Sequence, residues 1–130
     1  MRTGEFLKKT GISRETLRFY ERKGLLPAPP RTSSGYRIYS TALIQRLKFI
    51  KTAQQAGFTL KEIKELLELK QKKVSCREGR NIALKKREEL QQKMKAIREM
   101  KKILNRFILK CEEKGKKGLQ QQCHFSFDEI

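Results

Sequence analysis

Three cysteines and one histidine are the side chains of this sequence best suited to bind a metal ion. Cys111 and Cys123 stand at the two ends of a segment rich in Lys and Gln, and His124 follows directly. The third thiol, Cys76, lies 35 positions before Cys111. Thiolates prefer soft or borderline ions, whereas hard ions such as Mg²⁺ and Ca²⁺ prefer oxygen ligands. These residues therefore predict the binding of a thiophilic ion.

The number of thiols limits the choice of ion and leaves alternatives open. Three thiolates suit trigonal Hg(II), Cd(II) or Pb(II), whereas Zn(II) usually takes four ligands and would need His124 as the fourth. Three cysteines cannot all pair within one chain, and an intracellular chain disfavours a structural disulfide. Three unrelated thiols, or a thiol redox sensor without a metal, are the other interpretations. An enzyme is disfavoured because no acid–base group except His124 accompanies the thiols.

The charge of the chain indicates a polyanionic partner. Its 130 residues include 32 Lys and Arg but 14 Asp and Glu, a net charge of +18 that is typical of proteins that bind nucleic acid. The excess is divided evenly between residues 1–71 and 72–130, so charge alone does not locate the binding face. No apolar run is long enough to cross a membrane, and the N-terminus has no apolar signal core. We expect a cytoplasmic protein with one small domain and an extension.

Residues 1–40 show the pattern of a helix-turn-helix followed by a wing. Gly11 stands where the turn between two helices needs a permissive backbone, and Ser13 stands where the second helix needs an N-cap. Three prolines in "PAPPRTSSGYRIYS", residues 27–40, cannot continue a helix. Because "YRIY" then alternates as a short strand does, we expect a two-stranded wing.

Two further helices are expected in residues 41–70. The first pattern runs over residues 41–55 and ends at "AGF". The second starts at Thr59, where Glu62 three residues later completes the sequence signature of a capping box. We expect this helix to run to about Lys70.

A long helix is expected over residues 77–110. This segment contains no proline, and its one glycine is Gly79, near the start. Its apolar residues recur at 3-4 spacing, interrupted by Arg87 and Lys101, at Ala83, Leu90, Met94, Ile97, Leu104, Ile108 and Cys111. A second stripe lies beside it at Met100, Ile103 and Phe107. A helix of this length has more apolar face than so small a head could cover. The pattern therefore favours an antiparallel or parallel dimer seam over a helix packed on its own domain.

Together these segments resemble the MerR family of transcriptional regulators. The matching stretches are "TLRFYERKGLL", "RTSSGYRIYS" and "LKFIKTAQQAGFTLKEIKELL", and the resemblance covers nearly the whole chain. It implies a mainly α fold: a winged helix-turn-helix DNA-binding domain at 1–71, a linker and long dimerisation helix at 72–111, and a metal-binding loop and tail at 112–130. The two long helices of the implied homodimer form an antiparallel coiled coil.

The resemblance also implies a function. Regulators of this kind hold double-stranded promoter DNA as dimers, and metal binding realigns the promoter elements for RNA polymerase. The implied activity is activation of heavy-metal resistance genes, which is not an enzymatic one.

The resemblance implies Cys76, Cys111 and Cys123 as the metal ligands. Divalent-ion sensors of the family have cysteine at the start of the long helix, as this chain does, whereas monovalent-ion sensors have serine. "SCREGRN" resembles the mercury branch, and the adjacent cysteine pair of zinc sensors is absent because Glu112 follows Cys111. Hg(II) is therefore the preferred ion, with Cd(II), Pb(II) and Zn(II) as alternatives. The eleven residues between Cys111 and Cys123 are more than these branches lead us to expect.

The spacing of two cysteines gives a check on the dimer. A continuous helix rises about 1.5 Å per residue, so Cys76 and Cys111 of one chain would lie roughly 50 Å apart. They cannot share an ion within that chain. In an antiparallel pair, Cys76 of one subunit lies beside Cys111 of the other, and Cys123 folds back to join them. Each site would then be closed by both chains.

Seven residues are predicted to contact DNA: Arg14, Thr16, Arg18, Tyr20, Arg31, Tyr36 and Arg37. Those in the first turns of the second helix are placed to reach base edges and phosphates in the major groove. The Tyr20 hydroxyl is expected to donate to a phosphate, and its neighbour Phe19 is expected in the core. In the wing, the arginines and tyrosine are expected to donate to backbone phosphates. The lysines of the long helix alternate with glutamates, which is typical of a solvated face.

Overall fold

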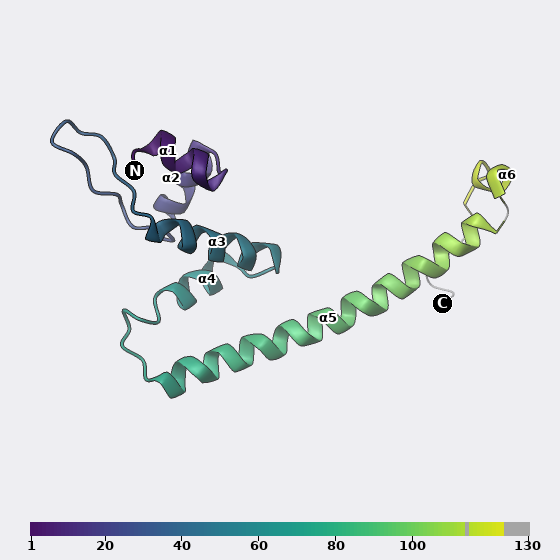
Figure 1. Cartoon of the computed structure of the whole chain (residues 1–130). Coiled ribbons are helices and arrows are strands. Elements are labelled where there is room, and N and C mark those ends of the chain that lie inside the picture. The colour runs from purple at the N-terminus through teal and green to yellow at the C-terminus, as the bar shows by residue number, and fades with distance from the viewer. Residues whose placement is uncertain (114, 124–130) are drawn as a thin grey trace. The chain divides into compact units, whose positions relative to one another are not determined.

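The computed structural model describes residues 1–113 and 115–123, and the chain divides into two compact units, Met1–Ser75 and Cys76–Ile130. The first unit, called the head below, contains α1 (Thr3–Thr10), α2 (Arg14–Arg22), α3 (Ala42–Gln55) and α4 (Leu60–Leu67) (Figure 1). The second contains α5 (Cys76–Glu112) and α6 (Gly115–Leu119). The predicted mainly α fold is confirmed.

The predicted helix-turn-helix is formed by α1 and α2. Helix α1 ends at Gly11, whose φ of 72° is left-handed and whose N–H donates to the carbonyl oxygen of Leu7. Ser13 then caps α2, because its hydroxyl oxygen accepts the N–H of Thr16 at 3.0 Å. Both local signals in the sequence therefore have the predicted structural role.

The wing is a hairpin without a regular strand, so the predicted two-stranded wing is wrong in detail. In the part of the chain that the structure describes, pairing is limited to the isolated bridges Arg31↔Arg37 and Arg2↔Ile38. The three prolines before the hairpin remove N–H donors and leave little backbone to pair. The turn itself closes as expected at Gly35, with a φ of 86° and an N–H that donates to the carbonyl oxygen of Thr32 at 2.9 Å.

The core of the head draws side chains from every one of its elements. The most completely buried large side chains are Phe6, Leu17, Leu25, Tyr39, Ile50 and Ile63. Phe6 of α1 stacks on Tyr39 of the wing, with ring centroids 4.6 Å apart and planes within 8°. This contact fixes the wing to the helix-turn-helix.

Helix α4 begins with the predicted capping box. The Thr59 hydroxyl accepts the N–H of Glu62, and the Glu62 carboxylate accepts the N–H of Thr59, both at 3.1 Å. The helix ends at Leu67, earlier than predicted, and hydrogen-bonded turns continue through residues 68–73.

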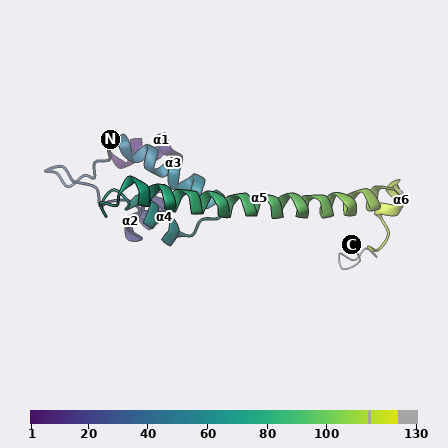
Figure 2. The ribbon, with the colours of Figure 1, turned by 90° about the horizontal axis from the view of Figure 1, so that it is seen from below.

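Helix α5 is one unbroken helix of 37 residues (Figures 1 and 2). None of its residues is buried. Four large apolar side chains of its predicted stripe are exposed to solvent: Met94, Ile97, Leu104 and Ile108, which are between 42% and 66% exposed. A row of large apolar side chains left open on one chain indicates a contact surface.

Candidate DNA interface and thiol site

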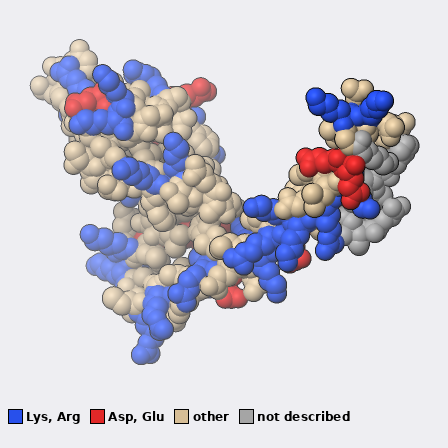
Figure 3. All heavy atoms as spheres, turned by 45° about the vertical axis from the view of Figure 1, so that its right-hand side comes forward, with Lys and Arg blue, Asp and Glu red and all other residues tan. Residues whose placement is uncertain are grey.

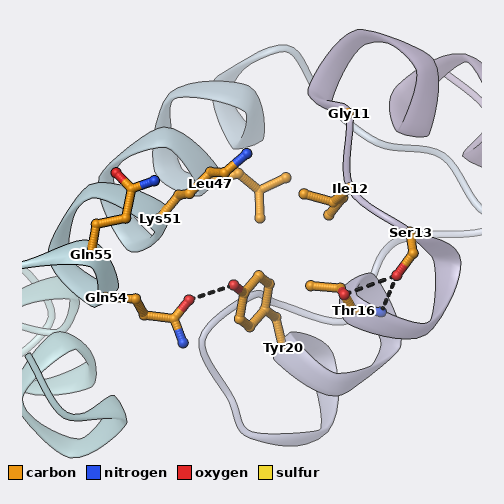
Figure 4. A pocket seen from close by; sticks show the side chains of 9 residues that line it. All are labelled: Gly11, Ile12, Ser13, Thr16, Tyr20, Leu47, Lys51, Gln54 and Gln55. Atoms are coloured by element: carbon orange, nitrogen blue, oxygen red, sulfur yellow. Dashed lines mark hydrogen bonds between the residues drawn. The ribbon is translucent and has the colours of Figure 1, made fainter. Parts of the chain in front are cut away.

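The start of α2 presents polar groups on a firmly capped turn. The Ser13 hydroxyl donates to the Thr16 hydroxyl oxygen at 2.9 Å and also accepts the backbone N–H of Thr16 (Figure 4). Arg14, one position after the cap, is exposed. Side chains on the first turn of a second helix are placed to meet base edges in helix-turn-helix proteins. The contact of Arg14 and Thr16 with DNA stays a prediction.

Tyr20 has a different role from the one predicted. The residue is 7% exposed, and its hydroxyl donates to Oε1 of Gln54 on α3 at 2.6 Å, across the pocket drawn in Figure 4. Burial raises the pKa of Tyr20, so the hydroxyl is protonated and available to donate this bond. Phe19, the neighbour of Tyr20, was expected in the core; it is only partly buried and packs against the core from outside. Tyr20 joins α2 to α3 because its face of the helix turns inward.

Glu21 is the centre of a hydrogen-bonded cluster that joins α2 to the wing. Its Oε2 accepts Nη1–H of Arg37 at 2.8 Å and Nη1–H of Arg18 at 3.4 Å. Its Oε1 accepts the hydroxyl of Tyr39 at 2.8 Å, and the same hydroxyl accepts Nη1–H of Arg18 at 3.2 Å. Two of the arginines predicted to contact DNA are thus held by one carboxylate. We call the four residues Arg18, Glu21, Arg37 and Tyr39 the Glu21 cluster.

Tyr39 is a neutral member of the Glu21 cluster. Burial raises the pKa of its hydroxyl, the hydrogen bond from Arg18 lowers it, and the neighbouring Glu21 raises it. The hydroxyl therefore remains protonated at neutral pH and can donate to the carboxylate.

The wing carries the other predicted contacts on its outer side. Arg31 is exposed and donates from Nη1 to the carbonyl oxygen of Gly35 at 3.1 Å, and Tyr36 is 53% exposed. The guanidinium carbon of Arg2 lies 4.1 Å from the centre of the Tyr36 ring, a cation–π contact. Arg2 thus adds a positive charge to the wing.

Sequence reasoning missed Arg2, Glu21 and Tyr39. Arg2 lies over the Tyr36 ring, and Tyr39 contacts Phe6 and Glu21. These partners are distant in the sequence, so no local pattern signals the contacts. Glu21 carried a weak signal, since it is an acid in a strongly basic segment directly after predicted DNA contacts.

The three thiols are free and are spread along the second unit. Cys76 is the first residue of α5 and is exposed, Cys111 is half-buried in the last turn of α5, and Cys123 is exposed. Within residues 1–113 and 115–123 no group of three His, Cys, Asp or Glu side chains could hold a metal ion. His124, the proposed fourth ligand for zinc, lies outside the described residues.

Basic side chains are found over both units. Figure 3 shows Lys and Arg on the head and along α5, with acidic side chains in smaller groups. Some lysines of α5 pair with glutamates on the solvent side, as Lys102 does with Glu99 at 3.4 Å. Such exposed pairs fit the predicted solvated face and contribute little stability. In the described part of the chain, no helix has the length and apolar character needed to span a membrane.

A capped helix-turn-helix beside an arginine-bearing wing defines a DNA-binding protein of the transcription-regulator class, which is not an enzyme. Residues 1–70 match the family described as MerR HTH family regulatory protein, and residues 44–107 match the family described as MerR, DNA binding. The chain therefore belongs to the MerR family, as its sequence predicts.

One relative and two solved structures are similar to this chain in sequence or fold. The mercuric resistance operon regulatory protein of Bacillus cereus is 40% identical over 113 residues, which are 86% of this chain and 86% of that protein. The transcription regulator PbrR691 of Ralstonia metallidurans CH34, solved with lead(II), has a TM-score of 0.60 at 34% identity, covering 86% of this chain and 88% of its own. HiNmlR, a MerR family regulator bound to promoter DNA, has a TM-score of 0.67 at 30% identity, covering 90% and 89%.

Proposed function

We propose that this protein is a homodimeric regulator that binds a thiophilic divalent ion, Hg(II) by preference, and activates heavy-metal resistance genes by distorting promoter DNA. The observation that carries the proposal is the placement of Cys76 and Cys111 at opposite ends of one unbroken helix. The helix rise puts these thiols roughly 50 Å apart within a chain. A shared ion would therefore require a second chain.

The open apolar stripe of α5 supports a second copy as that chain. Burying each of Met94, Ile97, Leu104 and Ile108 would contribute about 1.5 to 3 kcal/mol relative to full exposure, less the part already covered. An antiparallel pairing of two α5 helices would place Cys76 of one chain beside Cys111 of the other. Cys123, after the short helix α6, would complete each site.

The donor set fits a soft ion. Three thiolates favour Hg(II), Cd(II) or Pb(II), and similarity to a mercuric resistance regulator favours the first. Similarity to the lead(II) complex of PbrR691 keeps Pb(II) among the alternatives. Competitive titration of the reduced protein with Hg(II), Cd(II), Pb(II) and Zn(II) tests the proposal. One ion for each Cys76–Cys111–Cys123 set supports metal sensing, and no stoichiometric binding would favour a thiol redox sensor.

The proposed switch is a change in dimer geometry. An ion held by both ends of the α5 pair would favour one of two arrangements of the heads, and a ligand shifts such an equilibrium only by its differential affinity. The heads would then change the twist of the bound promoter so that its elements realign for RNA polymerase. Arg14, Thr16, Arg18, Arg31, Tyr36 and Arg37 are the residues proposed to hold the DNA.

Arg37→Ala is expected to weaken binding to specific and random duplexes alike. Arg37 has one Nη1–H on Glu21, and its remaining N–H groups can donate to a phosphate. Loss of one phosphate contact should lower the slope of log affinity against log salt by about one unit. Filter binding or fluorescence anisotropy between low and moderate salt measures this slope, and an unchanged slope would exclude a phosphate contact.

Arg18→Ala is expected to act mainly on the specific site. Arg18 lies one turn after the cap of α2, so a base-edge contact would cost on the order of 1 to 3 kcal/mol on the specific duplex when lost. The measurement is the same pair of binding curves. Equal losses on specific and random DNA would remove Arg18 from base recognition.

A further inference from the structure

An acidic side chain stands among the residues proposed to bind DNA. Glu21 has 12% of its side chain exposed and lies between Arg18 and Arg37, whose side chains are 28% and 25% exposed. A carboxylate near phosphates lowers the affinity of a protein for DNA by charge alone. Its place among these arginines therefore needs a reason other than attraction to DNA.

The contacts of the Glu21 cluster supply that reason. The carboxylate bonds one guanidinium from α2 and one from the wing, and it also accepts the hydroxyl of buried Tyr39. Tyr39 is stacked on Phe6 at 4.6 Å, so the carboxylate is anchored to the core of the head. Two long and flexible cationic side chains are thereby fixed relative to each other and to a rigid base.

Each arginine keeps donors for another partner. A guanidinium has five N–H donors in a planar fork, and the cluster uses Nη1 of Arg18 and Nη1 of Arg37. Both arginine side chains are partly exposed, at 28% for Arg18 and 25% for Arg37. Without a carboxylate between them, the two guanidinium groups would repel each other, and their side chains would adopt many conformations.

We propose that Glu21 is a positioning residue for DNA recognition: it holds Arg18 of α2 and Arg37 of the wing in one arrangement that fits the specific duplex. The inference rests on the proposed DNA-binding role of the two arginines. Its consequence is that Glu21 increases discrimination and does not increase affinity for DNA of unrelated sequence. A duplex that fits meets preorganised guanidinium groups, whereas an unrelated duplex meets an unfavourable negative charge.

The test compares two duplexes. One is a duplex selected by the wild-type protein from a random-sequence pool, and the other is a scrambled duplex of the same length and composition. Glu21→Ala should lower the ratio of specific to scrambled affinity at least about 10-fold, as expected for loss of charge-assisted hydrogen bonds. Binding to the scrambled duplex should stay equal or become tighter, because a negative charge is removed.

Two further variants separate positioning from general effects. Glu21→Gln keeps an acceptor oxygen and should have an intermediate ratio, and it carries the test if Glu21→Ala does not fold. Glu5→Ala is the matched charge control, since Glu5 pairs with Lys9 on α1 at 3.5 Å with both side chains more than half exposed. It should keep the wild-type ratio.

A double-mutant cycle asks whether Glu21 acts through the arginines. In a chain that already carries Arg18→Ala and Arg37→Ala, Glu21→Ala should change the ratio less than about 2-fold, because neither guanidinium remains to be positioned. A 10-fold loss in that background, or a wild-type ratio in folded Glu21→Ala protein, would overturn the inference. A wild-type protein that prefers no duplex would instead refute the proposed function.

Discussion

Replacing Cys111 with serine is expected to lower the affinity of the reduced dimer for Hg(II) by at least about 100-fold in competition with a small thiol. Loss of a residue that merely orients a metal ligand already costs 10- to 100-fold in many sites, and this change removes a ligand itself. Cys76→Ser and Cys123→Ser should have effects of similar size, because the proposed site uses each thiolate once. Displacement titration followed by thiolate-to-metal charge-transfer absorption measures the loss.

A neighbouring residue provides the control for the thiol variants. Gln122→Ser changes an exposed side chain next to Cys123 and should leave the affinity unchanged. If one of the three cysteine variants keeps the wild-type affinity while folded and dimeric, that thiol is not a ligand.

Phe6→Ala is expected to destabilise the head by about 3 to 5 kcal/mol. Phe6 has no exposed surface, and its ring stacks on Tyr39, so truncation removes both the buried area and the aromatic contact. The chain has no Trp, and its three tyrosines, Tyr20, Tyr36 and Tyr39, all lie in the head. Tyrosine fluorescence during urea unfolding of the full chain therefore reports on the head alone.

Phe49→Ala is the matched control for Phe6→Ala. Phe49 lies on α3 and is 40% exposed, so the same truncation should cost less than about 1 kcal/mol. Equal losses for the two phenylalanines would show that Phe6 does not hold the wing to the helix-turn-helix.

Features of the fold set by neighbouring residues were predictable from the sequence. Gly11 ends α1, Ser13 caps α2, and Thr59 with Glu62 forms a capping box, because each depends on contacts within a few positions of the chain. The long helix was also predictable, since its apolar spacing and lack of proline extend over the whole of α5.

Features set by distant residues were not predictable in this way. The burial of Tyr20 depends on Gln54, which is 34 positions away, and the Glu21–Arg37 pair spans 16 positions. The wing was assigned strands because its side chains alternate, but strands also need backbone partners, which its prolines limit. The thiol site stays a prediction because the two ends of α5 can meet only in a second chain.

The most direct test of the shared thiol site is a mixed dimer of Cys76→Ser and Cys111→Ser chains. As separate homodimers both variants should bind metal weakly, because every site lacks one thiolate. In the mixed dimer one site receives Cys76 from the Cys111→Ser chain, and Cys111 and Cys123 from the Cys76→Ser chain. That site is complete, whereas the other lacks two ligands.

Co-expression of differently tagged chains yields the mixed dimer for titration with Hg(II) under reducing conditions. A site built across the dimer predicts recovery of one tightly bound ion per dimer, with the charge-transfer absorption of three sulfurs. A site built within one chain predicts no recovery, because each chain still carries a broken site. A mixed dimer that is folded and dimeric but binds as weakly as its parents would contradict the intersubunit site and the antiparallel switch that depends on it.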